Sequence, residues 1–135
     1  MKRTMVTRVL GQLIVLRENN ETPLDSEWDA FLKLLAENRD RFEHIKILVV
    51  TDGGGPDYAQ RKRLDNTLLG KPVRVAVVTD SAKSRFIASA ISLINKQHMG
   101  FAMKEMPQAY VHLGMTPTEC REAENALPQM TAAIR

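Results

Sequence analysis

Two short runs of aliphatic and β-branched residues stand out in the hydrophobic pattern of the chain. The first covers 47–50 and the second covers 75–78, and each is followed by Thr-Asp. Runs of this length are too short for a free-standing helix and are typical of parallel strands that are buried on both faces. Residues that favour a helix start follow each run. The pattern therefore predicts two strand-to-helix turns that lie side by side at one edge of a sheet.

The N-terminal part of the chain predicts a hairpin and a helix. Weak alternation over 4–9, a glycine at position 11 and an apolar run at 13–16 indicate an antiparallel hairpin over 4–17. After a polar loop, Asp25 or Ser26 can cap a helix. Its apolar residues recur at the spacing of one helix face: Trp28, Phe31, Leu32 and Leu35.

Helices and strands alternate from there on. We expect a strand over 45–51, a helix that begins at Pro56 and stops at Gly70, and a strand over 73–79. Ser81 opens the most regular helix. Its expected core stripe consists of Phe86, Ile87, Ala90, Ile91 and Ile94, and its expected wet face consists of Arg85, Ser89, Ser92 and Lys96.

Three shorter elements complete the order. The pattern predicts a strand over 100–104 and a helix over 107–113 that Gly114 closes. Thr116 and Glu119 have the spacing of a capping box, which indicates a terminal helix to about Leu127, where Pro128 intervenes. The fold class is therefore α/β: a mixed sheet with an opening β-hairpin, then alternating strands and helices, parallel after the hairpin.

Composition adds limits to this picture. The 135 residues, 44% of them hydrophobic, suit a single domain over 1–135 with a core of about 4–127. The net charge of +3 is small and interspersed, so no nucleic-acid partner is expected. A lone cysteine, Cys120, fits a reducing compartment, and no segment has the roughly 20 apolar residues of a membrane span. We expect a cytoplasmic protein.

The edge with the two predicted turns carries the candidate site. Helix N-termini expose unpaired N–H groups and the positive end of the helix dipole, which suits an anion, a phosphorylated side chain or a partner loop. The candidate partner- or anion-binding residues are Asp52, Gly53, Gly54, Gly55, Asp80, Ser81, Lys83, Ser84 and Arg85.

Each part of this candidate site has a simpler explanation. The three glycines can form an anion cradle, or they can serve a tight turn that needs glycine for backbone reasons. Ser81 is the candidate phospho-acceptor, since Lys83 and Arg85 could pair with a phosphate there, although capping alone would also explain this serine. A basic run at 61–63 is typical of a solvated helix face.

The sequence offers little basis for catalysis or metal binding. The three histidines lie far apart, and Asp52 and Asp80 lack a third oxygen ligand nearby. The spacing of the chain brings no nucleophile, base and oxyanion donors together. We therefore expect no metal, no cofactor and no enzymatic activity.

The element order, the paired turns at 47–56 and 75–81, and the helix end at 110–114 together resemble the STAS domain. The chain is similar in particular to stand-alone proteins related to the sporulation anti-sigma-factor antagonist. The resemblance implies a STAS-like architecture and a phosphorylated Ser or Thr directly after an Asp, in the turn that follows the third strand. Asp52 matches the family's Asp, Gly53 stands where the acceptor hydroxyl would be, and the pair Asp80-Ser81 occurs one strand later.

The functional prediction is a non-enzymatic protein-interaction module in a regulatory or signalling setting. Its contact edge would consist of 52–56 and 80–85. One alternative is a small-ligand binder, either for a nucleotide or phosphate at the two helix N-termini or for an apolar, lipid-like molecule under a helix. Another alternative is a structural homo-oligomer that pairs through the hairpin edge or the Met-rich C-terminal region.

Overall fold

The computed structural model describes residues 2–93 and 95–135, which contain one five-stranded sheet in the order β1-β2-β3-β4-β5. The strands are β1 (Met5–Leu10), β2 (Leu13–Glu18), β3 (Lys46–Thr51), β4 (Arg74–Val78) and β5 (His98–Phe101). β1 pairs antiparallel with β2, and the other neighbouring strands are parallel. The predicted α/β class, with a hairpin that opens a mixed sheet, is confirmed.

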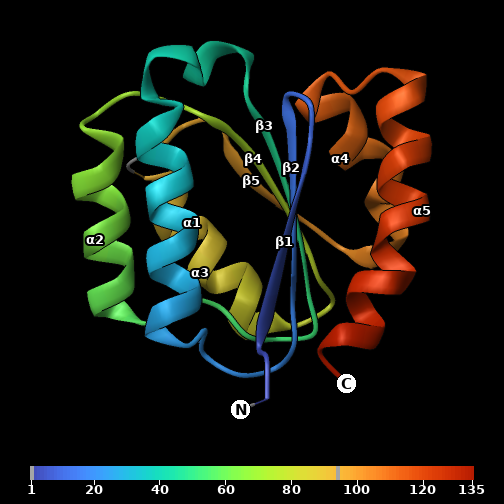
Figure 1. The fold of residues 1–135 in the computed structure, drawn as a ribbon, viewed down its shortest axis with the longest axis horizontal. Coiled ribbons are helices and arrows are strands. Elements are labelled where there is room, and N and C mark those ends of the chain that lie inside the picture. Colours follow the sequence, from blue (N-terminus) through green and yellow to red (C-terminus); the bar gives the residue numbers. More distant parts are fainter. Residues whose placement is uncertain (1, 94) are drawn as a thin grey trace.

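Helices cover both faces of the sheet (Figure 1). α1 (Asp25–Glu37), α2 (Tyr58–Leu68) and α3 (Ala82–Ser92) lie on one face, and α4 (Met106–Leu113) and α5 (Pro117–Ala133) lie on the other. The strands from β2 to β5 are added in one direction, so right-handed crossovers place all three connecting helices on the same face. Two 3₁₀ segments, η1 (Arg39–His44) and η2 (Met103–Glu105), complete the fold.

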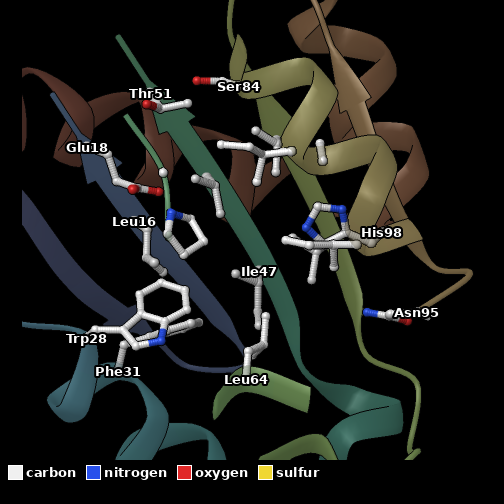
Figure 2. A pocket seen from close by; sticks show the side chains of 18 of the residues that line it. Leu16, Glu18, Trp28, Phe31, Ile47, Thr51, Leu64, Ser84, Asn95 and His98 are labelled. Atoms are coloured by element: carbon white, nitrogen blue, oxygen red, sulfur yellow. The ribbon is translucent and has the colours of Figure 1, made fainter. Parts of the chain in front are cut away.

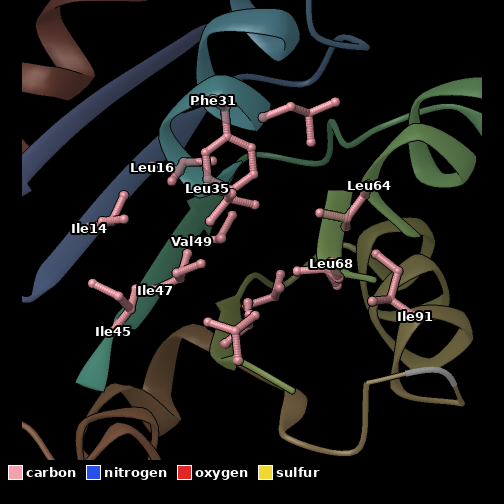
Figure 3. Packing of buried hydrophobic residues seen from close by; sticks show 14 of the residues in the cluster. Ile14, Leu16, Phe31, Leu35, Ile45, Ile47, Val49, Leu64, Leu68 and Ile91 are labelled. Atoms are coloured by element: carbon pink, nitrogen blue, oxygen red, sulfur yellow. The ribbon is translucent and has the colours of Figure 1, made fainter. Parts of the chain in front are cut away.

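The strand residues alternate between two apolar cores. Ile47 and Val49 of β3 point to the helices α1–α3, and Leu48 and Val50 point to α4 and α5. Figure 3 shows the first of these cores, where Phe31 of α1 and Leu64 of α2 approach the inner strands. Because both faces are buried, the two central strands have the continuous apolar sequence that made them recognisable.

The first part of α2 differs from the prediction. α2 begins at Tyr58 instead of Pro56, because the side chain of Asp57 accepts a hydrogen bond from the Gln60 amide at 2.8 Å and caps the helix there. The helix ends close to the predicted stop, with Leu69 and Gly70 both at positive φ.

The prediction of the buried side of α3 was also partly wrong. Ser81 caps the helix as predicted, by accepting a hydrogen bond from the Ser84 amide. However, Phe86 is 75% exposed, and the buried residues of α3 are Ser84, Ala88 and Ile91. Ser84 donates a hydrogen bond to the Gly54 carbonyl at 3.1 Å, and this contact turns the Ser84 side of the helix toward the sheet. The predicted core residue Ile94 lies outside the described residues.

The C-terminal elements needed two further corrections. β5 begins at His98 and ends at Phe101, earlier than predicted. α5 continues through Pro128 to Ala133, because Met130 and Ile134 beyond the proline are still buried against the sheet. The short helix closed by Gly114 at positive φ is confirmed. Within the part of the chain that the structure describes, no helix is both long and apolar enough to cross a bilayer.

Candidate functional site

The two strand-to-helix turns lie side by side. β3 and β4 are paired as far as Val50 and Val78, so both turns leave the sheet at the same edge. A Cβ atom added to Gly53 would lie 3.4 Å from Ser81 Oγ. The predicted adjacency of the turns is therefore present in the structure.

Three amides at this edge that could bind an anion already donate hydrogen bonds within the protein. The Gly53 amide donates to Thr51 Oγ1 at 3.1 Å, and the Gly54 amide donates to the Asn19 carbonyl at 2.8 Å. On the second turn, the Ser81 amide donates to Thr79 Oγ1 at 3.1 Å. An anion at this edge would have to compete with these internal bonds.

The two aspartates of the edge hold other segments in place. Asp52 accepts a hydrogen bond from Arg17 at 2.8 Å and lies 3.5 Å from a guanidinium nitrogen of Arg135, just beyond α5. Asp80 accepts a hydrogen bond from the Met103 amide at 3.0 Å, at the start of η2. Lys83 and Arg85 are exposed beside Ser81. Both carboxylates therefore have structural contacts that the sequence did not reveal.

Gly54 is required by a close approach of two backbone segments. A Cβ atom at this position would collide with the carbonyl oxygens of Glu21 and Asn19, in the loop between β2 and α1. Thr51 Oγ1 and Ser84 Oγ both donate to the Gly54 carbonyl. At this glycine, the simpler interpretation of the Gly-rich turn accounts for the residue.

A cavity lies behind this edge, between the sheet and the helices α1–α3 (Figure 2). Its volume is about 60 Å³, which exceeds the roughly 10–15 Å³ that one water molecule needs. Apolar side chains from strands and helices form most of its wall, among them Leu16, Trp28, Ile47 and Leu64. From the sequence, an apolar molecule under a helix was predicted only as an alternative to a protein-interaction module, and none of these residues was assigned to its site.

Two polar side chains in the cavity wall each have a buried atom without a partner. Glu18, at the end of β2, is 3% exposed, and His98, at the start of β5, is 4% exposed. Neither Glu18 Oε2 nor His98 Nδ1 has a hydrogen-bond partner among residues 2–93 and 95–135. Such atoms are rare in folded proteins, since burial without a partner is costly. Figure 2 shows both side chains among the lining residues.

Burial keeps both groups uncharged near neutral pH. It raises the pKa of Glu18 to about 8, the neighbouring carboxylate of Glu27 raises it further, and Arg17 opposes this shift. Burial also lowers the pKa of His98 to about 4, against the opposing effect of a hydrogen bond with the Ala88 backbone. The cavity therefore offers a carboxylic acid and a neutral imidazole instead of two ions.

The other polar groups of the wall are satisfied within the protein. Thr51 and Ser84 donate to Gly54, as described above. Asn95 donates from Nδ2 to the Val73 carbonyl at 2.7 Å. Glu18 and His98 are therefore distinguished from these neighbours by their free hydrogen-bonding capacity.

The cavity reaches toward solvent at the same sheet edge. Among the described lining residues, Gly55 and Ile87 are only partly buried, whereas the others are buried. A Cβ atom on Gly55 would lie 3.5 Å from Ile87 Cδ1. The mouth of the cavity is therefore formed by the Gly-rich turn and α3, two segments that the sequence had singled out for another reason.

Sequence reasoning missed Glu18 and His98. Glu18 continues the alternation of Ile14 and Leu16, which would have placed this carboxyl group on the buried side of the strand. His98 has no comparable signal, because β5 is short and was predicted to begin after it.

The described residues contain no group of three or more His, Cys, Asp or Glu side chains that could hold a metal ion. Comparisons of the chain with family models, curated proteins and solved structures found no match.

Proposed function

We propose that this protein binds a small, predominantly apolar molecule in the cavity between the sheet and α1–α3. The observation that carries the proposal is the pair of unpartnered buried atoms, Glu18 Oε2 and His98 Nδ1, in an otherwise apolar wall. Leaving a buried polar group unpaired costs about 1–3 kcal/mol. A ligand that pairs with one of these groups recovers part of that free energy and also buries its own apolar surface.

We propose that the protein binds this molecule without catalysing a reaction on it. Catalysis by an activated hydroxyl or thiol requires a base within hydrogen-bonding reach of the nucleophile. In the part of the chain that the structure describes, no hydrogen bond joins a Ser or Cys side chain to a His or carboxylate side chain. The Thr4 hydroxyl does donate to the Glu27 carboxylate, but neither residue lines the cavity. We therefore propose a carrier or sensor of a small molecule.

The test uses Trp28, the single tryptophan of the chain, which lines the cavity. Titration with 1-propanol, followed by tryptophan fluorescence, should give a saturable change. Val77→Phe places a larger side chain in the cavity wall and should weaken binding at least about tenfold. Val9→Phe, at a 52% exposed position of β1, is the matched control and should bind as the wild type does.

Two results would contradict the proposal. One is a fluorescence change that never saturates. The other is equal affinity of the wild type and the Val77→Phe variant, provided that both are folded by circular dichroism. Solvent extraction of the purified protein, followed by mass spectrometry, would identify a molecule that co-purifies with it.

A second candidate function is the protein-interaction module predicted from the sequence. It is favoured by the adjacency of the two turns, since Gly53 and Ser81 are neighbours. The exposed side chains of Lys83 and Arg85 also lie close to Ser81 in the chain. The hairpin and the strand-to-helix turns also accord with the proposed STAS-like architecture. In this proposal the edge at 52–56 and 80–85 contacts a partner protein.

Ser81→Asp tests this second candidate. Asp caps a helix about as well as Ser, so α3 should remain folded. Loss of a co-purifying partner in pull-down experiments would support a phosphate-regulated contact at this edge, whereas an unchanged yield would indicate that Ser81 only caps the helix. Light scattering would separate a monomeric adaptor from a homo-oligomer.

A further inference from the structure

We infer that the ligand of this cavity is an uncharged, compact amphipathic molecule whose polar group accepts a hydrogen bond from the Glu18 carboxyl group. The inference depends on the proposed function and specifies the chemical class of the ligand. It stands on the position of Glu18, the charges around the cavity, and the cavity volume of about 60 Å³.

Among the described lining residues, Glu18 has no counter-ion in the cavity. Its sequence neighbour Arg17 is committed elsewhere, to Asp52 at 2.8 Å and to Thr131 Oγ1 at 2.9 Å on the α5 side. Glu27 of α1 adds negative charge near Glu18, and its own oxygens accept hydrogen bonds from Thr4, Met5 and Leu24. A buried carboxyl group in this setting keeps its proton and can donate it in a hydrogen bond.

The wall of the cavity disfavours a charged ligand. No Lys or Arg side chain occurs among the described lining residues, so a ligand carboxylate or phosphate would be buried without a cation. A ligand ammonium group would need Glu18 to ionise, against the burial that holds the proton on this carboxyl group. A hydroxyl or carboxamide group needs neither change and can both accept from and donate to Glu18.

The size of the ligand is limited by the cavity. Glu18 is level with Thr51 on β3, whereas His98 is level with Val75 on β4, near the opposite end of the strands. From strand spacing and rise, the two backbone positions differ by about 14 Å across the sheet and about 13 Å along it. The cavity volume of about 60 Å³ equals the space of roughly four to six water molecules, which is too small for a molecule that spans both positions. A compact ligand with its polar group at Glu18 and a short apolar group against the neighbouring side chains fits this volume.

The experiment compares four probes with the same three-carbon chain, whose size suits the cavity: 1-propanol, propanamide, propylamine and propanoate. Near neutral pH the first two are uncharged, the third is a cation and the fourth is an anion. We expect at least about tenfold tighter binding of a neutral probe than of either ion, measured by Trp28 fluorescence and by calorimetry. Tighter binding of propylamine or propanoate would overturn this inference and leave the proposed function standing, whereas the absence of binding by all four would overturn the proposed function itself.

Glu18→Gln is the matched variant, because an amide keeps the size and both hydrogen-bonding roles of the carboxylic acid without its proton equilibrium. In the wild type, the affinity for propanamide should fall as the pH rises past the Glu18 pKa of about 8. In Glu18→Gln the affinity should stay within about threefold across this range. A fall that persists in the variant would show that another group controls binding, which would overturn the assignment of Glu18.

Discussion

Arg17 donates a hydrogen bond from Nη2 to Oδ1 of Asp52 over 2.8 Å, and this ion pair joins the end of β2 to the turn after β3. The Arg17 side chain is only 6% exposed, whereas that of Asp52 is 36% exposed. Arg17 also donates to Thr131 Oγ1 at 2.9 Å, so the pair links α5 to the same sheet edge. A carboxylate that the sequence marks as a candidate contact for a partner therefore also balances a buried guanidinium charge.

Replacing Asp52 should be costly for this reason. Asp52→Asn keeps the shape but leaves the buried Arg17 without its counter-charge, and we expect a loss of about 1–2 kcal/mol in the free energy of unfolding, since solvent screens part of the pair. Urea unfolding followed by circular dichroism measures this change. Asp80→Asn is the control, because Asp80 accepts from the Met103 amide at an exposed site and balances no buried charge among the described residues. This variant should change stability by less than about 0.5 kcal/mol. Equal losses in both variants would contradict the role of the ion pair.

Gly54 and Gly55 should respond differently to the same substitution. Gly54→Ala places a methyl group against the carbonyls of Glu21 and Asn19, so the loop must move and the protein should lose about 2 kcal/mol or more. Gly55→Ala meets only an ordinary contact with Ile87 Cδ1 at 3.5 Å and should be nearly neutral. Thermal unfolding of the two variants makes the comparison. A neutral Gly54→Ala would mean that the loop over this turn is not held in place.

Glu18 should make stability depend on pH. Its pKa is about 8 in the folded protein and 4.5 is the ordinary value, so between these values the unfolded chain binds fewer protons than the folded one. The free energy of unfolding therefore falls as the pH rises through this window. Glu18→Gln should be more stable than the wild type at pH 8, by a few kcal/mol at most, and the difference should shrink as the pH falls toward 4.5. A difference that does not change with pH would contradict the burial of an uncharged carboxyl group.

His98 should have the opposite dependence. Its pKa is about 4 in the folded protein against an ordinary 6.5, so in this range the unfolded chain binds more protons and stability falls as the pH is lowered. His98→Leu should remove this acid sensitivity when urea unfolding is compared at pH 4.5 and pH 7. His44→Leu, at an exposed histidine, should retain it. The same acid sensitivity in wild type and His98→Leu would assign the effect to other groups.

The mouth of the cavity can be tested by kinetics. Ile87→Phe adds bulk opposite Gly55, and we expect slower association of 1-propanol in stopped-flow measurements of Trp28 fluorescence, by a factor of about three or more. Ser89→Phe, two residues along the exposed side of α3, is the control and should leave the rate unchanged. Unchanged association in the Ile87→Phe variant would place the entrance elsewhere.

The sequence predicted the strands and their turns well, because strands buried on both faces have continuous apolar runs, as at 47–50 and 75–78. It failed where a tertiary contact outweighs the local pattern. In α3, Ser84 faces the sheet and donates a hydrogen bond to Gly54, so the predicted core residue Phe86 lies in solvent. In α5, burial of side chains beyond Pro128 keeps the helix continuous.

The site shows the same division. Adjacency of the turns follows from parallel pairing and was predictable. The presence of both Glu18 and His98 in the wall of one cavity was not predictable. It depends on the register across four strands and on the distance between the sheet and α1, α2 and α3. Long-range geometry of this kind leaves no local pattern in the chain.

The division of the helices into a connecting layer and a terminal layer has a mechanical consequence. α4 and α5 follow the last strand and pack on Leu48, Val50 and Val78. This packing can keep the sheet in place while the helices on the opposite face move. α1 to α3 are each tied to strands at both ends, which limits their excursions to small outward shifts. A ligand could therefore enter and leave when α1–α3 move locally, without loss of the hydrogen bonds between the strands.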